Sequence, residues 1–551
     1  MEAARGRGPG GKGQEMKRSA LVQVVTAWLG LLLTTGAPAA TVTVQVLATT
    51  DLHGMIRHGA AAEDAGGWLR LATVIRRERD AFGSSRTLVV DCGDSLQGSY
   101  EALTSRGGVA TALLKATPVD VWVPGNHDFD FGTPRLVRFL SGFGDRALAG
   151  NLTLPDPAAP GGRRRLPAWR LFSRNGASVA VIGVTASYLN QWLTGERTSG
   201  YTVEKAVATL ERILPEVHQA GPDAILLAAH QGWDPEDARG VNEIADIAQR
   251  FPEIDLILGG HTHQTVPGRR IGPRTWYVQP GSGADWVGQV RLTVDTASHR
   301  VVDITSKLLP AGPEVIPDAA ANAAVRDDLD EAARFGREPA GVLATALDAG
   351  GMPGETCAMS ELLCQALAEA VTADVALHGK LTPAGLPAGP VTAADLFTLI
   401  PYENDVVTVE VTAAELAEIV LEQQSQRTGS YYSGLWGLHG RIDPGGKTVR
   451  FTDAAGRPVP PDRRLRLVLN SHAAAGSGGR FPRLRGLVHS PGAGMAMTGL
   501  DTREALRRFL LAHSPYTPRA ETWLTSRPAP AAPASSPPGS WHGVESRPVA
   551  P

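Results

Sequence analysis

Short apolar runs that alternate with amphipathic stretches constrain the first half of the chain more than any other feature. From Thr41 to about Pro310 the runs are rich in β-branched residues, while stretches such as Trp68–Arg79 repeat apolar residues at helical spacing. Alternating strands and helices predict an α/β domain built from layers. The runs predicted as strands are Val42–Leu47, Thr87–Val90, Val119–Val123, Val179–Val184, Ala224–Leu227, Asp255–Leu258 and Trp276–Val278.

Polar clusters with metal-ligating side chains follow most of these strands. A lone histidine at a strand end is more often structural than a ligand, but five clusters in one domain favour a metal centre. The side chains are imidazoles and carboxylates, which suit zinc, manganese or iron(II), and the lack of thiolate argues against a structural zinc site. The clusters are Asp51-Leu52-His53-Gly54, Gly93-Asp94, Gly125-Asn126-His127-Asp128, His230 and Gly259-Gly260-His261-Thr262-His263.

A pair of divalent ions fits this set of side chains. Two ions about 3.5–4 Å apart need a shared anionic ligand, which is a role for an aspartate such as Asp94. Such a pair polarises a phosphoryl oxygen, lowers the pKa of a bound water and clamps an in-line displacement. The neighbouring glycines permit tight turns close to the ions. The predicted cofactors are therefore two divalent metal ions, zinc, manganese or similar.

The clusters resemble the successive metal motifs of a known enzyme superfamily. The segments ATTDLHG, DCGDSLQGS, PGNHDFDFG, AAH and GGHTHQ are similar to those of calcineurin-like metallophosphoesterases. More narrowly, the chain resembles the 5′-nucleotidase family, which includes periplasmic UDP-sugar hydrolases and 2′,3′-cyclic phosphodiesterases. The resemblance covers nearly all of Thr41–Thr525. It implies an N-terminal four-layer metallophosphoesterase-type β-sandwich flanked by helices, and a second α+β domain that binds the substrate.

The resemblance also implies which groups hold the ions and which act on the phosphoryl group. By position, His127 is not a ligand but stabilises charge on the transferred phosphoryl oxygens, and Asp130 orients and charges that imidazole. Asp128 stands where relatives commonly carry Glu, and we assign it no role. One ion is expected on Asp51, His53, Asp94 and His263, and the other on Asp94, Asn126, His230 and His261.

The first 39 residues have the pattern of a secretory signal. Lys17 and Arg18 precede an apolar run over Leu21–Leu33, and Ala37-Pro38-Ala39 supplies small residues for cleavage. An uncleaved membrane anchor is the alternative, although the run is short for a membrane span. No later stretch is long and apolar enough to cross a bilayer, so we expect an exported protein, periplasmic or secreted.

Two large domains are expected, because 551 residues exceed one ordinary core. Helical periodicity over Pro317–Arg334 predicts a linker helix between them. The end of the chain is dominated by Pro, Ala and Ser, which predicts disorder. The predicted boundaries are 1–39 for the signal, 41–312 for the dimetal phosphoesterase domain, 313–339 for the linker helix, 340–525 for the substrate-binding domain and 526–551 for the tail.

The three cysteines predict no thiolate chemistry. Cys92 ends an apolar run and is predicted to be a buried thiol. Cys357 and Cys364 either form a disulfide, which an exported protein tolerates, or stay free. The chain has no Cys-x-x-Cys spacing, so a cysteine metal site or nucleophile is not expected.

Aromatic residues of the second domain resemble the walls of the family's base-binding site. Tyr402 in LIPYEN falls where relatives place one aromatic face, and Phe481 in NSHAAAGSGGRFP is the candidate for the other. Asn470 begins this glycine-rich loop, whose backbone can approach a ligand closely. Two rings around a nucleobase contribute about 1–3 kcal/mol of stacking per base. Core packing is the alternative role for either ring.

The phosphate-binding part of the second domain departs from the family pattern. Relatives usually carry an NGGGIR-like stretch after a strand of the ADVAL type, but Asp374–Thr382 is one residue shorter and contains no arginine. An upstream arginine is also missing, and Glu355 lies near its place. Lys380 cannot reproduce the two hydrogen bonds with which an arginine clamps phosphate. It serves as a single point charge, or it is a loop lysine without a role.

The leading hypothesis is an exported phosphoesterase that hydrolyses nucleotide esters, similar to 5′-nucleotidases and UDP-sugar hydrolases. A 2′,3′-cyclic-nucleotide phosphodiesterase is the alternative enzyme, and a non-catalytic surface binding protein is the alternative of another class. The complete ligand set, with His127 and Asp130, favours an enzyme. A formal net charge of −3 provides no basic excess, so we expect a small nucleotide as partner and no nucleic-acid polymer. The sequence leaves the oligomeric state open.

Overall fold

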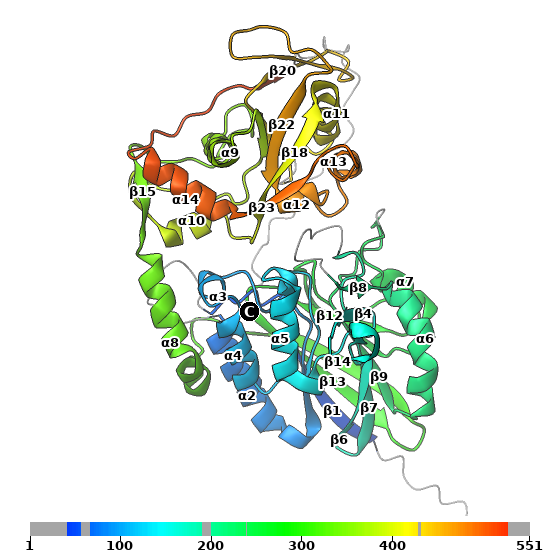
Figure 1. Ribbon diagram of the computed structural model, residues 1–551. Coiled ribbons are helices and arrows are strands. Elements are labelled where there is room, and N and C mark those ends of the chain that lie inside the picture. The colour runs from blue at the N-terminus through cyan, green and yellow to red at the C-terminus, as the bar shows by residue number, and fades with distance from the viewer. Residues whose placement is uncertain (1–40, 57–66, 190–199, 238–239, 428–430, 527–551) are drawn as a thin grey trace, which may run out of the picture.

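Two domains lie one above the other and are joined along one side by a single helix, α8 (Ala319–Gly336) (Figure 1). The predicted export signal and the predicted tail lie outside the described residues, apart from Ser526, which ends a strand. Within the described part of the chain, no helix has both the length and the apolar character of a membrane span. The computed structural model describes residues 41–56, 67–189, 200–237, 240–427 and 431–526.

Two β-sheets packed face to face form the centre of the first domain. In spatial order, the first sheet contains β14 (Arg300–Pro310), β13 (Trp286–Asp295), β1 (Thr41–Thr49), β2 (Thr87–Asp91) and β3 (Val121–Trp122). The second contains β11 (Thr265–Arg270), β12 (Trp276–Pro280), β10 (Leu256–Leu258), β9 (Ala224–Ala229), β7 (Ala177–Val184) and β6 (Trp169–Arg174). All seven runs that the sequence predicts as strands overlap strands of these sheets.

Alternating side chains along the strands build separate apolar layers. On β9, Leu226 and Ala228 join the core between the two sheets, whereas Ile225 and Leu227 join the core beneath the outer helices. Successive residues of a strand point to opposite faces, so a strand that is apolar throughout is buried on both sides. This explains why the runs in the sequence are continuous and do not alternate with polar residues.

Helices cover the outer face of each sheet and complete the four layers (Figure 1). The packing of α2 follows from its sequence, because Trp68, Leu71 and Ile75 share one buried face. The predicted α/β sandwich flanked by helices is therefore confirmed. The covering helices are α2 (Trp68–Phe82), α4 (Gly108–Ala116) and α5 (Thr133–Phe143) on the five-stranded sheet, and α6 (Ala206–Gln219) and α7 (Ile244–Arg250) on the six-stranded sheet.

A mixed five-stranded sheet forms the centre of the second domain, as the predicted α+β class requires. Its middle strands β16 and β22 run parallel, and β19 and β18 run antiparallel to them on either side. The strands in spatial order are β19 (Gly434–Trp436), β16 (Val375–His378), β22 (Arg464–Asn470), β18 (Asp405–Thr412) and β23 (Ala496–Asp501). The helices around them are α9 (Ala358–Val371), α11 (Ala413–Gln424), α13 (Pro482–Val488) and α14 (Thr502–Ala512).

Smaller elements complete both domains. The remaining helices are α3 (Tyr100–Thr104), α10 (Ala393–Leu399) and α12 (Ser471–Ala474), with 3₁₀ turns η1 (Ser84–Arg86), η2 (His127–Phe129), η3 (Gly144–Arg146) and η4 (Pro160–Gly162). The remaining strands are β4 (Leu152–Pro155), β5 (Arg163–Arg165), β8 (Thr202–Val203), β15 (Pro339–Leu343), β17 (Gly389–Thr392), β20 (His439–Ile442), β21 (Val449–Thr452) and β24 (Leu524–Ser526).

Helix α8 connects the domains while its apolar face belongs to the core of the first. Tyr100 links this helix to the second domain. Its hydroxyl donates a hydrogen bond of 2.6 Å to the carbonyl of Ala332, and its ring stacks on Phe335 and meets Phe397 of α10 edge-on. The helix lies inside the range 313–339 that the sequence predicts for a linker, and this aromatic cluster forms the joint.

The cysteines are free and buried. The thiol of Cys92 is buried as the sequence predicts. Cys357 caps α9 and Cys364 lies within it, so seven residues separate them along one helix. At about 1.5 Å of rise per residue this separation exceeds the Cα distance of roughly 4.4–6.8 Å that a disulfide needs. The alternative with free thiols is therefore the one that the fold adopts.

Candidate metal centre

The metal-ligating clusters meet at one edge of the two central sheets. The parallel strands β1, β2 and β3 end there in one sheet, and β9 and β10 in the other. Residues far apart in sequence therefore converge: the backbone N–H of His261 donates to the carboxylate of Asp51, 210 positions away. The ligands follow their strands in the order Asp51 and His53 after β1, Asp94 after β2, Asn126 after β3, His230 after β9, and His261 and His263 after β10.

Six of the seven predicted ligands form two compact groups, Asp51 with His53 and His263, and Asp94 with His230 and His261. Within each group the donor atoms lie within 4.8 Å of one another. In the first, the Nε2 atoms of His53 and His263 are 3.1 Å apart, and Nε2 of His263 lies 3.4 Å from Oδ1 of Asp51. Nitrogen and oxygen atoms this close around a common point suit a cation between them.

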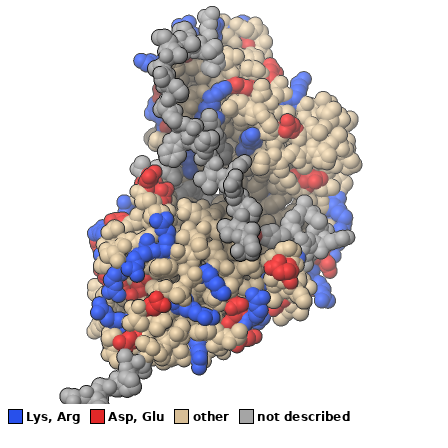
Figure 2. Space-filling view, turned by 180° about the vertical axis from the view of Figure 1, so that it is seen from behind, with Lys and Arg blue, Asp and Glu red and all other residues tan. Residues whose placement is uncertain are grey.

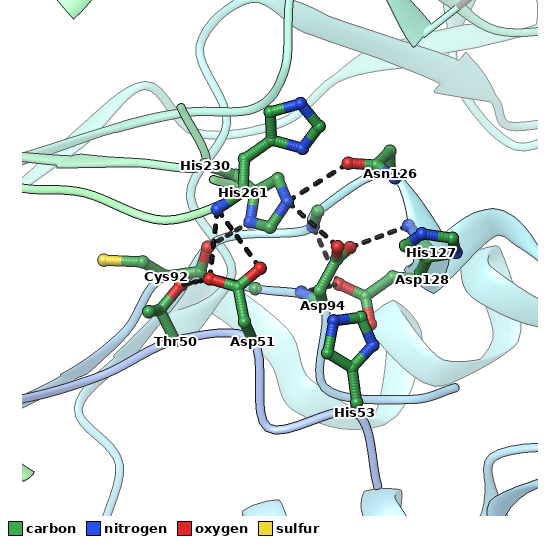
Figure 3. A network of polar contacts seen from close by, with 12 residues as sticks. Thr50, Asp51, His53, Cys92, Asp94, Asn126, His127, Asp128, His230 and His261 are labelled. Carbon is green, nitrogen blue, oxygen red and sulfur yellow. Dashed lines mark hydrogen bonds and ion pairs between the residues drawn. The ribbon is translucent and has the colours of Figure 1, made fainter. Parts of the chain in front are cut away.

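The second group includes the seventh predicted ligand, Asn126. Oδ2 of Asp94 lies 3.1 Å from Nε2 of His230, and Oδ1 of Asn126 lies 3.2 Å from the same nitrogen (Figure 3). The backbone N–H of His127 donates to Oδ1 of Asp94 at 2.7 Å. The carboxylate of Asp94 is thus held between the loops that follow β2 and β3.

Backbone carbonyls orient two of the histidines. Nδ1–H of His53 donates to the carbonyl of Gln97 at 3.1 Å, and Nδ1–H of His230 donates to the carbonyl of Cys92 at 2.7 Å. A ring that donates through Nδ1 keeps the lone pair of Nε2 for a metal ion. These supports are main-chain carbonyl oxygens, which every residue carries, so the sequence does not predict them.

Five of the ligands hold left-handed backbone conformations, which residues other than glycine seldom adopt. Each costs about 1–3 kcal/mol and persists only where the surrounding structure enforces it. Their concentration in one place indicates that pointing these side chains inward lowers the free energy of unfolding. The φ angles are 49° at Asp51, 49° at His53, 53° at Asp94, 69° at His261 and 54° at His263.

Glycine at position 125 is required by the close approach of two ligands. A Cβ atom there would lie 2.2 Å from Oδ1 of Asp94 and 2.6 Å from Cε1 of His230. Both distances are far shorter than van der Waals contact, and neither ligand can move without leaving the centre. Gly125 therefore allows the loop after β3 to pass directly behind the ligands.

The electrostatics of the centre suit metal binding. Burial lowers the pKa of His53 to about 4 and that of His261 to about 3, so both are neutral, which is the form that binds a metal ion. Burial also lowers the pKa of His230, but the carboxylate of Asp94 outweighs it and raises the value to about 10. A metal ion bound at His230 would displace that proton.

His127 lies beside the two ligand groups without belonging to either. Its Nδ1 donates to Oδ2 of Asp130 at 2.8 Å. Burial lowers the pKa of His127, but the charges of Asp130 and Asp94 outweigh burial and raise the value to about 9. The imidazole is therefore a cation fixed in one orientation beside the ligands, as the sequence resemblance implies for a group that faces phosphoryl oxygens.

Asp128, to which the sequence analysis assigns no role, binds the backbone of two ligand loops. Its Oδ1 accepts the N–H groups of Ser95 and Leu96 at 2.9 and 2.8 Å. Its Oδ2 accepts those of Asp94 and Gly125 at 2.9 and 2.7 Å. One buried carboxylate therefore satisfies four backbone donors and ties the loop after β2 to the loop after β3 (Figure 3). Its position after the GNH segment was visible in the sequence, but its partners were not.

Replacing Asp128 with Asn is expected to weaken metal binding. The substitution turns one acceptor oxygen into a donor, so two of the four backbone N–H groups lose their partner. Changes of this kind around a metal site cost about 10–100-fold in affinity. Metal content of the purified variant, measured by mass spectrometry after dialysis, should fall in parallel with turnover. Asp128→Glu keeps both acceptor oxygens and should lose less, whereas full metal content in Asp128→Asn would contradict this role.

A cleft of about 730 Å³ lies between the ligand groups and the second domain. Its volume is within the range of about 300–1,000 Å³ that small-molecule sites occupy. His127 and Asp130 line it from the first domain. On the face of the molecule seen in Figure 2, acidic and basic residues are interspersed and do not gather into one basic stripe. The cleft thus has the dimensions of a site for a small molecule.

The second domain presents one edge of its sheet to the cleft. Lys380 follows β16 and Asn470 ends β22, while Tyr431 precedes β19 and Tyr402 precedes β18. Because β19 and β18 run antiparallel to the two strands between them, their starts lie at the same edge as the ends of β16 and β22. The result is a surface with a tyrosine on either side and polar groups in the middle.

The two polar groups in the middle are held by the backbone and by a buried histidine. Nζ of Lys380 donates to the carbonyl of Ala349 at 3.0 Å. Oδ1 of Asn470 accepts the N–H of Ala473 at 2.8 Å, and its Nδ2 donates to Nε2 of His378 at 3.2 Å. Both side chains line the cleft with their orientation already fixed.

Comparisons with known proteins agree with this arrangement. A family model described as calcineurin-like phosphoesterase matches residues 44–265, and one described as 5′-nucleotidase, C-terminal domain, matches residues 339–485. The chain belongs to the 5′-nucleotidase family. The predicted enzyme class, a metal-dependent phosphoester hydrolase, is thereby confirmed, and the fold implies divalent metal ions as cofactors.

Three known proteins show the extent of the similarity. The "Probable 5′-nucleotidase" of Treponema pallidum is 24% identical over 534 residues, which cover 82% of this chain and 87% of that protein. Endonuclease YhcR of Bacillus subtilis is 25% identical over 494 residues, or 85% of this chain, but the match spans only 40% of that protein. The crystal structure of a 5′-nucleotidase precursor from Thermus thermophilus has the same fold, with a TM-score of 0.66, 19% identity and coverage of 88% and 99%.

One expectation carried over from the 5′-nucleotidase family is wrong. Phe481, predicted as the second wall of a base-binding site, is 1% exposed and packs in the core of the second domain. It directly precedes α13, and its ring turns inward with the apolar face of that helix. Tyr431 stands in the cleft instead, 40% exposed, with the guanidinium of Arg480 3.7 Å from its ring centroid. Nothing in the segment SYYSG distinguishes this tyrosine from an ordinary loop residue.

Phe481→Leu should therefore affect stability and not substrate affinity. Loss of part of a buried ring is expected to lower the free energy of unfolding by about 1–3 kcal/mol. Thermal denaturation measures this loss, and nucleotide KM at a temperature where the variant is folded should match that of the unsubstituted protein. A KM increase without a stability loss would show that Phe481 contributes to substrate binding.

Proposed function

We propose that the protein hydrolyses phosphate esters of nucleotides with two divalent metal ions, in the manner of a 5′-nucleotidase or UDP-sugar hydrolase. One observation carries the proposal. Members of both metal-ligand groups and the His127–Asp130 pair line one side of a cleft, and the exposed rings of Tyr402 and Tyr431 line the other. Phosphoryl transfer depends mainly on positioning and electrostatic stabilisation, and an aromatic wall suits a nucleobase.

The ligand groups would hold the two ions on either side of Asp94. Bound ions would polarise the phosphoryl oxygens and activate a water for in-line attack. Imidazole and carboxylate donors fit zinc, manganese or a similar ion. Support comes from the neutral His53 and His261 and from the backbone carbonyls that leave Nε2 to the metal. One ion would lie on Asp51, His53, Asp94 and His263, and the other on Asp94, Asn126, His230 and His261.

His127 would stabilise the charge that develops on the phosphoryl oxygens. Asp130 accepts from Nδ1, and because nearby carboxylates keep the imidazole cationic, Nε2 also carries a proton that can be donated to an oxygen. The same carboxylate keeps the imidazole cationic and fixes its plane. A donor held in place before the reaction contributes more than one that must reorient.

His127→Ala is expected to keep the metal ions and lower kcat by about 10²–10³-fold, the usual cost of one such donor. Metal content and kcat, measured on the same preparation, separate the two effects. Asp130→Asn should cause a smaller loss, because it keeps a hydrogen-bond acceptor but removes the charge. Unchanged turnover in His127→Ala would remove this residue from the mechanism.

The base of the nucleotide would lie between Tyr402 and Tyr431. Both rings line the cleft and are 41% and 40% exposed, so a ligand can cover them. Arg480 stacks on Tyr431 and fixes the orientation of that ring. Asn470 and Lys380 lie between the tyrosines at the sheet edge and would hydrogen-bond the polar atoms of base or sugar.

Tyr431→Leu tests this arrangement. Loss of one stacking partner costs about 1–3 kcal/mol, so KM for a nucleotide should rise by roughly 5–150-fold. The loss should be much smaller for ethyl phosphate, which has neither a base nor another aromatic ring. Steady-state kinetics on both substrates provide the comparison. Equal losses on the two substrates would contradict a base-binding role for Tyr431.

A substrate panel with metal reconstitution tests the function as a whole. Chelated protein should be inactive and should recover turnover with manganese or zinc. Nucleoside 5′-monophosphates, 3′-monophosphates, 2′,3′-cyclic nucleotides and UDP-glucose are compared at equal concentration. Preferred hydrolysis of a 5′-monophosphate or of UDP-glucose supports the proposal, and no hydrolysis of any substrate contradicts it.

The alternative, a 2′,3′-cyclic-nucleotide phosphodiesterase, rests on the missing arginines. Glu355, near the expected place of one arginine, forms an ion pair of 2.5 Å with Arg427, and Lys380 is the cationic residue that follows β16. A cyclic diester carries less charge than a monoester and needs a weaker clamp. Preferred hydrolysis of the cyclic ester in the panel would favour this alternative.

The proposed site of action is outside the cytoplasm. The basic, apolar and small-residue pattern of residues 1–39 supports this localisation.

A further inference from the structure

We infer that the second domain completes the catalytic centre, because Gln97 holds the segment Pro401-Tyr402 so that the ring of Tyr402 packs on His127. Tyr402 is then a positioning residue for the chemical step as well as a wall for the base. The inference rests on the proposed function, since it needs His127 to act on the phosphoryl group. This positioning role differs from a base-binding role in one respect, because it affects turnover equally for a substrate without a base.

Gln97 makes contact with both domains. It lies in the loop that carries Asp94 and is 1% exposed. Its backbone carbonyl accepts Nδ1–H of His53 at 3.1 Å, and its side-chain Nε2 donates to the carbonyl of Pro401 at 3.1 Å. Among the described residues its Oε1 has no hydrogen-bond partner. The hydrogen bond to Pro401 fixes the orientation of the side-chain amide. Gln97 therefore supports both a metal ligand and the adjoining segment of the second domain.

The ring of Tyr402 lies almost parallel to the imidazole of His127. The ring centroids are 5.8 Å apart and the planes differ by 24°. On another side His127 meets the ring of His53 edge-on at 5.4 Å, and its Nδ1 is held by Asp130. Aromatic rings attract one another when they stack with an offset at a centroid separation of about 4.5–7 Å. Loss of the Tyr402 ring would leave one face of His127 without this contact and allow the imidazole to tilt.

These contacts mean that Gln97 acts on His127 through Tyr402. Gln97 holds Pro401, the next residue is Tyr402, and its ring restrains His127. A substrate that fills only the phosphoryl site should therefore still depend on the second domain. A role for Tyr402 in base stacking alone would predict no such dependence.

The test measures kcat and KM for ethyl phosphate, a small ester without an aromatic ring, at saturating manganese in the full chain. Gln97→Leu removes one hydrogen bond and is expected to lower kcat by about 3–10-fold. Tyr402→Leu is expected to lower kcat by a similar factor of about 3–10. The KM for the ester should change little in both variants, and so should the metal content of the protein. Tyr402→Phe keeps the ring and should recover most of the loss.

Two controls separate positioning from general damage. Gln219→Leu changes an exposed glutamine at the end of α6 and should leave kcat unaltered. In the double variant Gln97→Leu/Tyr402→Leu the losses should not multiply, because both substitutions act through the same contact with His127. Full multiplication of the two losses would mean that Gln97 and Tyr402 act independently and would overturn the inference.

The outcomes also distinguish this inference from the proposed function. If Tyr402→Leu loses turnover on nucleotides but keeps full kcat on the small ester, Tyr402 is a base wall only, and the inference fails while the proposed function stands. If the unsubstituted protein with manganese hydrolyses neither substrate, the proposed function fails and the inference falls with it. A drop of kcat on the small ester, with metal retained and rescue by Tyr402→Phe, supports it.

Discussion

Hydrogen-bonded pairing of parallel strands brings five loops to one edge of the central sheets, and every feature of the metal centre depends on that pairing. The edge collects two buried aspartates, Asp51 and Asp94, and four histidines from positions more than two hundred residues apart. The cationic His127 and His230 balance the two buried carboxylates, but five ligands hold strained backbone conformations. The large apolar core between the sheets supplies the stability that keeps such a site in place.

Main-chain contacts give the site its accuracy. Carbonyls of Gln97 and Cys92 fix which nitrogen of two histidines faces inward, and Asp128 gathers four backbone N–H groups from two loops. Such outer contacts govern the orientation of ligands and hence the affinity for metal. They act as a unit, because a loop released at one point would carry its ligand away from the others. The rigidity of the centre therefore comes from its supports as much as from the ligands themselves.

The second domain contributes to the site through the geometry of its sheet. Two antiparallel strands flank two parallel ones, so loops from four strands reach the same edge and face the metal centre across the cleft. This arrangement places one tyrosine at each end of the wall that the second domain contributes to the cleft. It also lets the Pro401-Tyr402 segment reach back to Gln97 and His127, so the boundary between the domains passes through the active site and not beside it.

The sequence by itself determined the layered α/β class, the strands, the family and the candidate ligands, because these depend on local periodicity and on residue types that only metal chemistry explains. Tertiary structure alone decided which aromatic residues reach the cleft. Phe481 and Tyr431 both lie in glycine-containing loops, but Phe481 precedes a helix that packs inward, while Tyr431 precedes a strand that starts at the cleft. The roles of Asp128 and Gln97 were equally hidden, since their partners are backbone atoms of distant segments. Residue identity encodes side-chain chemistry, whereas the position of a main-chain donor or acceptor exists only once the chain has folded.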